Sequence, residues 1–92
     1  MTILTTSDMQ WTPCASKLPP MHKASANLLE MGVEKVSDMC LITIRSGTGT
    51  FVDGGAMLQD GKWTSTFLDA FELAGYPYDV LAWIPYPEPW KE

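Results

Sequence analysis

The sequence closes with an apolar run followed by prolines at every second position, and this pattern restricts the fold more than any other. Residues 80–84 read Val-Leu-Ala-Trp-Ile, and Pro85, Pro87 and Pro89 follow them. Alternate N–H groups of an extended chain point to the same side, so these prolines remove the donors from one edge only. We therefore expect a buried strand that runs into a stiff terminal edge strand, which another chain cannot extend on its proline side.

A similar pattern occurs near the other end of the sequence. Trp11-Thr-Pro13 repeats the spacing of Trp83-Ile-Pro85. In an extended chain, each segment places its Trp and its Pro on the same face. We expect the two segments to lie near each other, which would bring the two ends of the chain together around a Trp–Pro cluster.

Two helices are predicted between these segments. Residues 21–31 carry apolar side chains at spacings of three and four, which is the helical period; they are Met21, Ala24, Leu28 and Met31. Gly32 suits the position that follows a helix end. A shorter helix is expected at 67–75, with Thr66 as its N-cap and Gly75 as its terminating residue.

Three consecutive strands are predicted at 39–45, 50–59 and 62–66. In the first strand, every second residue is expected to face the core. These residues are Cys40, Ile42 and Ile44. Asp53-Gly-Gly55 is expected to interrupt the second strand as a bulge or bend. Asp60-Gly61 is the strongest hairpin signal in the sequence and joins the second strand to the third.

The fold class that these elements predict is α+β. The strands at 39–45, 50–59, 62–66 and 80–85, with a further candidate at 9–13, give a small antiparallel sheet of about four to five strands. A meander connects its central strands, and one or two short helices cover it. Ninety-two residues are expected to form a single domain, 1–92.

Composition excludes several classes of function. The net charge is −5 and the six Lys and Arg residues are scattered, which argues against nucleic acid as a partner. No apolar run approaches the ~18 residues that span a bilayer, so no membrane association is expected. The N-terminal residues lack the pattern of a secretory signal. We expect a cytoplasmic protein in which Cys14 and Cys40 are free thiols.

His22 is the only histidine, so any acid–base scheme of the usual kind must use it. Cys14, Ser16 and Ser25 are the nucleophiles nearest in sequence, but nearness along the chain does not supply a catalytic geometry. Cys14, Cys40 and His22 also lack the paired spacing of a zinc site. We therefore predict a surface histidine, a non-enzymatic protein, and neither a metal nor a cofactor.

Residues 46–50 (Ser-Gly-Thr-Gly-Thr) form a glycine-rich turn that could hold a phosphate group through its backbone N–H groups. They lack the Gly-Lys-Ser/Thr ending of a P-loop. A flexible hairpin loop is the simpler interpretation. The alternative is an oligomer that sequesters a small nucleotide signal between subunits, using Gly47, Gly49, Arg45 and Lys62.

Both ends of the sequence resemble a known family. Residues 11–19 (Trp-Thr-Pro-Cys-Ala-Ser-Lys-Leu-Pro) are similar to its opening pattern, and residues 80–89 (Val-Leu-Ala-Trp-Ile-Pro-Tyr-Pro-Glu-Pro) to its ending. The family is the bacteriophage and prophage family called domain of unknown function 551. The sequence departs from it in the stretch 20–37, where a predicted helix intervenes, and at Ala82, where the family often has His. The resemblance implies a phage origin and a fold type, and it carries no catalytic residues.

The function predicted from these observations is that of a phage or prophage accessory protein, which binds and modulates a bacterial host protein. Inhibition of a host defence system is its concrete form. The predicted contact residues are aromatic: Tyr86, Trp90, Trp63 and Phe51. The sequence leaves open whether Tyr86 and Trp90 are exposed or fold back onto the core. It also leaves open homo-oligomerisation, and a minor structural component of the phage particle is a further alternative.

Overall fold

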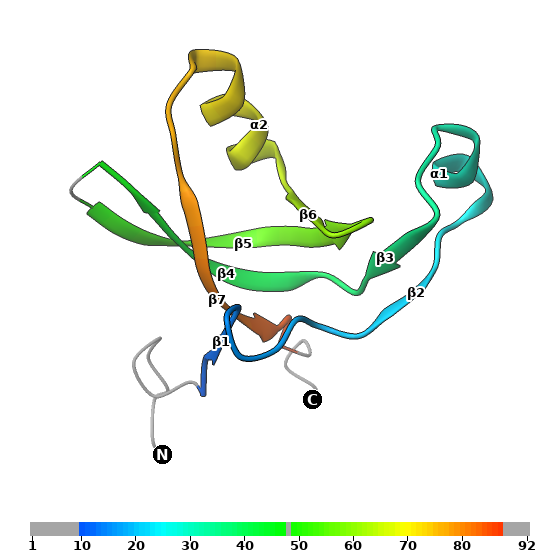
Figure 1. Cartoon of the computed structure of the whole chain (residues 1–92), viewed down its shortest axis with the longest axis horizontal. Helices are drawn as coiled ribbons and strands as arrows, with labels where there is room; N and C mark the ends of the chain where they lie inside the picture. The colour runs from blue at the N-terminus through cyan, green and yellow to red at the C-terminus, as the bar shows by residue number, and fades with distance from the viewer. Residues whose placement is uncertain (1–9, 48, 88–92) are drawn as a thin grey trace, which may run out of the picture.

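The computed structural model describes residues 10–47 and 49–87. In this part of the chain, two short helices accompany a curled antiparallel sheet of seven strands (Figure 1). The elements in order are β1 (Thr12–Pro13), β2 (Met21–Lys23), α1 (Ala26–Glu30), β3 (Lys35–Ser37), β4 (Cys40–Ser46), β5 (Gly49–Gln59), β6 (Lys62–Thr64), α2 (Thr66–Ala74) and β7 (Asp79–Pro85). The α+β class agrees with the prediction, but the sheet has more strands than the four to five expected.

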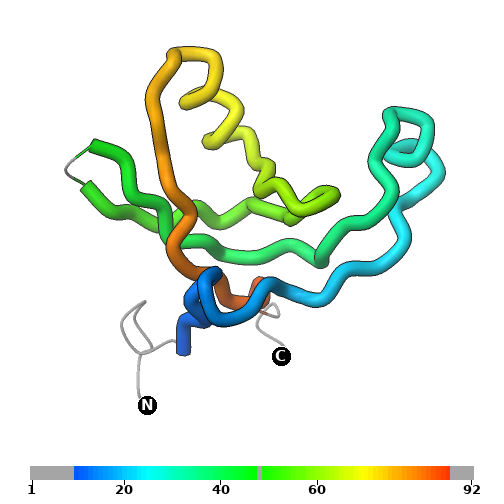
Figure 2. The backbone as a smooth tube through the Cα atoms, in the orientation of Figure 1, coloured from blue at the N-terminus to red at the C-terminus, as the bar shows by residue number. Residues whose placement is uncertain are grey.

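The strand order is β1-β7-β4-β5-β3-β2, and β6 also pairs with β5. The long strand β5 therefore belongs to both halves of the sheet. Its first residues pair with β4, and its last residues pair with β3 and β6. The predicted meander of β4, β5 and β6 is present. The smooth backbone of Figure 2 shows how strongly this sheet bends.

The bend of β5 coincides with the predicted interruption at its glycine pair. Ile42 lies opposite Asp53, whereas Cys40 lies opposite Ala56, so three steps along β5 match two along β4. This extra residue is a β-bulge, which increases local twist. The Asp60-Gly61 hairpin also forms as predicted, because both residues adopt positive φ, 49° and 87°.

The predicted strand at 80–84 lies inside the sheet, and the edge strand predicted for the proline stretch that follows is described only as far as residue 87 and stays a prediction. Strand β7 lies between β4 and β1, because the short strand β1 pairs with its free side. Thr12 lies opposite Trp83, so the two Trp-x-Pro segments are adjacent, as expected. The N–H of Tyr86 donates to the carbonyl of Met39 at 3.2 Å, on the edge that keeps its donors. Pro89 lies outside the described residues.

The helix predicted at 21–31 is wrong in its first half. Met21–Lys23 form strand β2, which pairs with β3. Only Ala26–Glu30 are helical, and none of the residues of α1 is buried. Strand pairing with β3 is thus favoured at 21–23 over the predicted helix, because a helix there would have no core to pack against. Gly32 ends the helix at φ 87°, as predicted.

Helix α2 covers one face of the sheet and completes the core. Its N-cap is Ser65 rather than the predicted Thr66, because the Ser65 hydroxyl accepts a hydrogen bond from the Leu68 N–H at 3.0 Å. Gly75 ends the helix at φ 76°. Leu68 packs on the central strands, and the buried cluster is Cys40, Ile42, Ile44, Ala56, Leu68 and Trp83. We call this side of the sheet the helix face.

Candidate binding site

An apolar cavity of about 300 Å³ lies where the segment before β2 crosses the ends of β4 and β7. The indole N–H of Trp83 donates to the carbonyl of Lys17 at 2.8 Å, which anchors that segment over the sheet. The cavity is lined by Pro19, Pro20, Met21, His22, Asp38, Met39, Cys40, Trp83 and Pro85. Three prolines make its walls stiff, because each fixes its own backbone torsion. We call this cavity the proline pocket.

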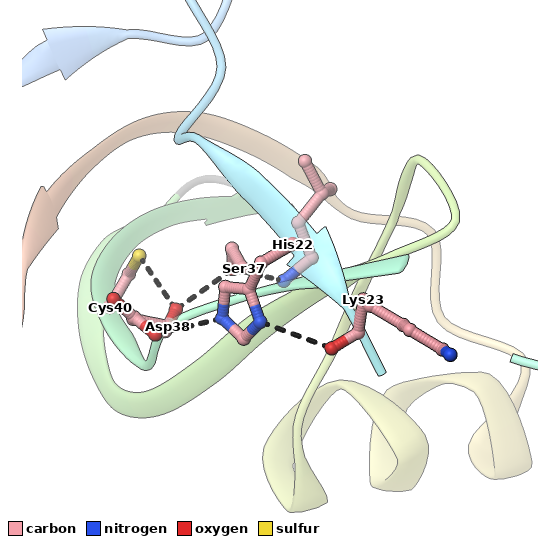
Figure 3. Close-up of polar contacts among 6 residues, drawn as sticks. His22, Lys23, Ser37, Asp38 and Cys40 are labelled. Carbon is pink, nitrogen blue, oxygen red and sulfur yellow. Dashed lines mark hydrogen bonds and ion pairs between the residues drawn. The ribbon is translucent and has the colours of Figure 1, made fainter. Parts of the chain in front are cut away.

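His22 and Asp38 are the polar groups of the proline pocket (Figure 3). His22 Nε2 lies 2.9 Å from Asp38 Oδ1, and His22 Nδ1 lies 3.3 Å from the carbonyl oxygen of Lys23. Both partners are acceptors, so the doubly protonated ring satisfies both contacts. The hydrogen bond to Asp38 raises the pKa of His22, and the Lys23 carbonyl adds to this effect. Pairing of β2 with β3 brings the two residues together.

Replacing Asp38 by asparagine is expected to lower the pKa of His22 toward its ordinary value, because the main partner that favours the imidazolium loses its charge. Since the folded-state pKa is raised, the pair stabilises the fold below the unfolded pKa of about 6.5 and loses that effect as pH rises through the folded value. NMR titration of the His22 ring protons measures this pKa in the original protein and in the variant. An unchanged pKa in the variant would show that Asp38 is not the cause.

The thiol of Cys40 and the hydroxyl of Ser37, near the proline pocket, form hydrogen bonds with the backbone. Cys40 Sγ donates to the carbonyl of Asp38 at 3.4 Å, and burial raises the pKa of this thiol. The Ser37 hydroxyl donates to the same carbonyl at 2.8 Å and accepts from the Leu58 N–H at 2.9 Å. A protonated thiol is a poor nucleophile. These contacts, drawn in Figure 3, hold the β3–β4 corner together and provide no nucleophile–base pair.

Cys14 packs against the core cluster that contains Cys40, and both are free thiols. Burial raises the pKa of Cys14 as well. Within residues 10–47 and 49–87, no three His, Cys, Asp or Glu side chains gather as a metal site would require. Neither described helix is long and apolar enough to cross a membrane.

The structure places the predicted aromatic contact residues in different surroundings. Tyr86 is 53% exposed and directly follows Pro85, a wall of the proline pocket. Trp63 and Phe51 are half-buried against the core, and the ring of Phe51 lies 5.2 Å from that of Phe67. Trp90 lies outside the described residues. Tyr86 is therefore the described candidate that is both exposed and adjacent to a cavity.

The residues of the alternative nucleotide site do not converge within one chain. Arg45 and Gly47 line a small cavity of about 170 Å³, whereas Lys62 lies beyond the other end of β5. An extended strand of this length spans up to about 30 Å. Each cation also has an acidic partner, Asp79 at 3.2 Å for Arg45 and Glu72 at 3.0 Å for Lys62. Gly49 begins β5 and does not line that cavity.

Sequence reasoning named Tyr86 as a contact residue, which stays a prediction, and it did not identify the proline pocket or the His22–Asp38 pair. The two residues are sixteen positions apart, and β2–β3 pairing alone aligns them. Residues 35–38 hold a single apolar residue, Val36, so no alternation in the sequence indicated β3. Compared with protein-family models, curated proteins and solved structures, the chain matches none of them. The phage family resemblance therefore stays a prediction.

Proposed function

We propose that the protein is a non-enzymatic accessory protein of a phage or prophage that binds a bacterial host protein in the cytoplasm. The proline pocket is the observation that carries the proposal. It takes one apolar side chain of the host protein, and Asp38 at its mouth adds a polar contact. The phage origin rests on the resemblance of the two chain ends, and inhibition of a host defence protein is the modulation that we expect.

The size of the proline pocket supports a side chain as its occupant. Its volume of about 300 Å³ lies at the lower limit of cavities that enclose small-molecule ligands. Energetic anchors of protein interfaces are single apolar or aromatic side chains that fill such pockets. Rigid proline walls keep the site open before binding, so little ordering entropy is lost when it fills.

The surface beside the proline pocket also suits a protein partner. Leu18, Met39 and Tyr86 are 46%, 49% and 53% exposed, and each belongs to a segment that borders the cavity. Large apolar side chains grouped around a cavity are typical of a protein interaction site. A host protein would bury them around the anchor side chain and exclude water from it.

Replacing Met21 by glutamate should abolish host-protein binding, because it removes an apolar wall of the pocket and puts a charge where the apolar anchor side chain would lie. Leu29→Glu is the matched control, since Leu29 is 39% exposed on α1 and does not line the pocket. Native mass spectrometry of each protein purified from bacterial lysate measures the complex. We expect a stoichiometric host partner with the original protein and with Leu29→Glu, but not with Met21→Glu.

A photo-crosslinking residue placed at position 20 then identifies the contact directly. Pro20 is exposed and lines the pocket, so a crosslinker there should capture the same host protein, whereas one at position 29 should not. Circular dichroism verifies that each variant keeps the sheet. A partner retained by Met21→Glu, or captured equally from both positions, would exclude the proline pocket as the docking site.

A further inference from the structure

The side-chain donors that line the proline pocket are all engaged within the described part of the chain. His22 Nε2 lies 2.9 Å from Asp38 Oδ1, and His22 Nδ1 lies 3.3 Å from a backbone carbonyl oxygen, so the doubly protonated ring uses both N–H groups (Figure 3). The Cys40 thiol and the Trp83 indole N–H each donate to a backbone carbonyl. The proline and methionine side chains of the pocket have no donor to offer.

The free polar group of the pocket is an acceptor, the second carboxylate oxygen of Asp38. His22 contacts Oδ1, and among residues 10–47 and 49–87 no donor contacts Oδ2. The Asp38 side chain is 94% exposed, so a bound group can reach this oxygen. An occupant with an N–H or O–H group can donate to it. A carboxylate or phosphate group would instead bring a second anion to a site whose side-chain donors are already engaged.

The walls of the pocket favour an aromatic ring as the occupant. Met21 and Met39 both line the cavity, and methionine sulfur makes favourable contacts with aromatic rings. Tyrosine and tryptophan combine such a ring with a polar tip, which finds a hydrogen-bond partner when the ring is buried. Their side chains therefore match both features of the pocket, the apolar walls and the acceptor at its mouth.

The charge of His22 disfavours a cationic occupant. Lysine and arginine also donate hydrogen bonds, but either would bring a positive charge beside the imidazolium and compete with it for Asp38. The apolar walls would also remove water from that charge. A neutral donor avoids both costs.

We propose that the proline pocket is specific for an aromatic side chain with a neutral donor, which is tyrosine or tryptophan, and that this donor binds Asp38. The inference rests on the proposed function, because it names the anchor side chain that the host protein supplies. Hydrogen bonds to a charged acceptor are stronger than those between neutral groups, so the donor provides selectivity. Phenylalanine would fill the same walls without this bond.

Amino-acid amides test the pocket without the host protein. N-acetyl-tyrosinamide and N-acetyl-phenylalaninamide differ by one hydroxyl group, and NMR of the labelled whole chain measures their binding through the backbone amides of His22 and Met39. The amide of Leu73, which is 92% exposed on α2, is the control and should not shift. We expect the tyrosine amide to bind about 5- to 10-fold more tightly than the phenylalanine amide. N-acetyl-tryptophanamide, titrated in parallel, shows which of the two rings fits better.

Asp38→Ala shows whether the selectivity comes from the carboxylate. The variant should bind the tyrosine and phenylalanine amides equally, because the donor has lost its acceptor. A pocket deformed by the substitution would weaken both amides alike, so the ratio of the two affinities isolates the hydrogen bond. Asp38→Asn keeps one uncharged carbonyl oxygen and should retain a smaller preference, which makes it the second variant if Asp38→Ala does not fold.

Three results would overturn the inference: equal binding of the tyrosine and phenylalanine amides to the original protein, a preference that survives Asp38→Ala, or no shift with any aromatic amide. The proposed function is decided separately, by the host complex and its loss in Met21→Glu. A host complex that Met21→Glu abolishes, together with equal binding of the two amides, would keep the pocket as the docking site and reject the donor-bearing anchor.

Discussion

Replacing Leu68 by alanine is expected to lower the free energy of unfolding by about 2–5 kcal/mol. Leu68 is 1% exposed and lies in the cluster that joins α2 to β4, β5 and β7. Its removal loses the transfer free energy of the buried side chain and leaves a cavity between α2 and the sheet. A domain of this size is stable by only ~5–14 kcal/mol, so the loss is a large share.

Leu73→Ala is the matched control for this prediction, because it makes the same substitution in the same helix. Leu73 is 92% exposed, so its truncation should change stability by less than about 0.5 kcal/mol. Urea unfolding followed by tryptophan fluorescence measures both variants, and an unchanged m value supports comparison of the midpoints. Equal losses in the two variants would mean that α2 does not pack on the sheet through Leu68.

Local signals in the sequence predicted the centre of the fold well. The alternation of Cys40, Ile42 and Ile44 predicted strand β4 and its buried face, and all three are buried. Asp60-Gly61 predicted the hairpin, since type I′ turns require two positive φ values. These features depend on neighbours within a few residues, which is the information that a single sequence holds.

Strands β2 and β3 could not be predicted, because their pairing depends on contacts far along the chain. Met21 lies opposite Ser37, and Val36 lies opposite Gln59. Periodicity at 21–31 favoured a helix, but only five residues there are helical. The proline pocket was missed for the same reason, since its walls come from segments that meet only after β2 has joined β3.

Asp60 shows how one residue can serve a local and a distant role. The sequence indicated a turn residue, and it does adopt φ 49° in the hairpin. Its carboxylate also accepts hydrogen bonds from the N–H groups of Glu34 at 3.0 Å and Lys35 at 2.9 Å. In return, the Asp60 N–H donates to the carbonyl of Lys35 at 2.9 Å. These bonds fix the start of β3 to the β5–β6 hairpin.

Asp60→Ala is therefore expected to lower the free energy of unfolding by about 2–3 kcal/mol, because it removes acceptors for two N–H groups and places alanine at a positive φ. Asp60→Asn keeps the turn preference and one carbonyl acceptor, so it should cost about 1 kcal/mol or less. Urea unfolding measures the free energy of unfolding of each variant. Amide hydrogen exchange locates the change, and Glu34 and Lys35 should lose protection in Asp60→Ala before the strand residues of β4 do. Unchanged protection of Glu34 and Lys35 in Asp60→Ala would show that the carboxylate acts only on its own turn and does not hold β3.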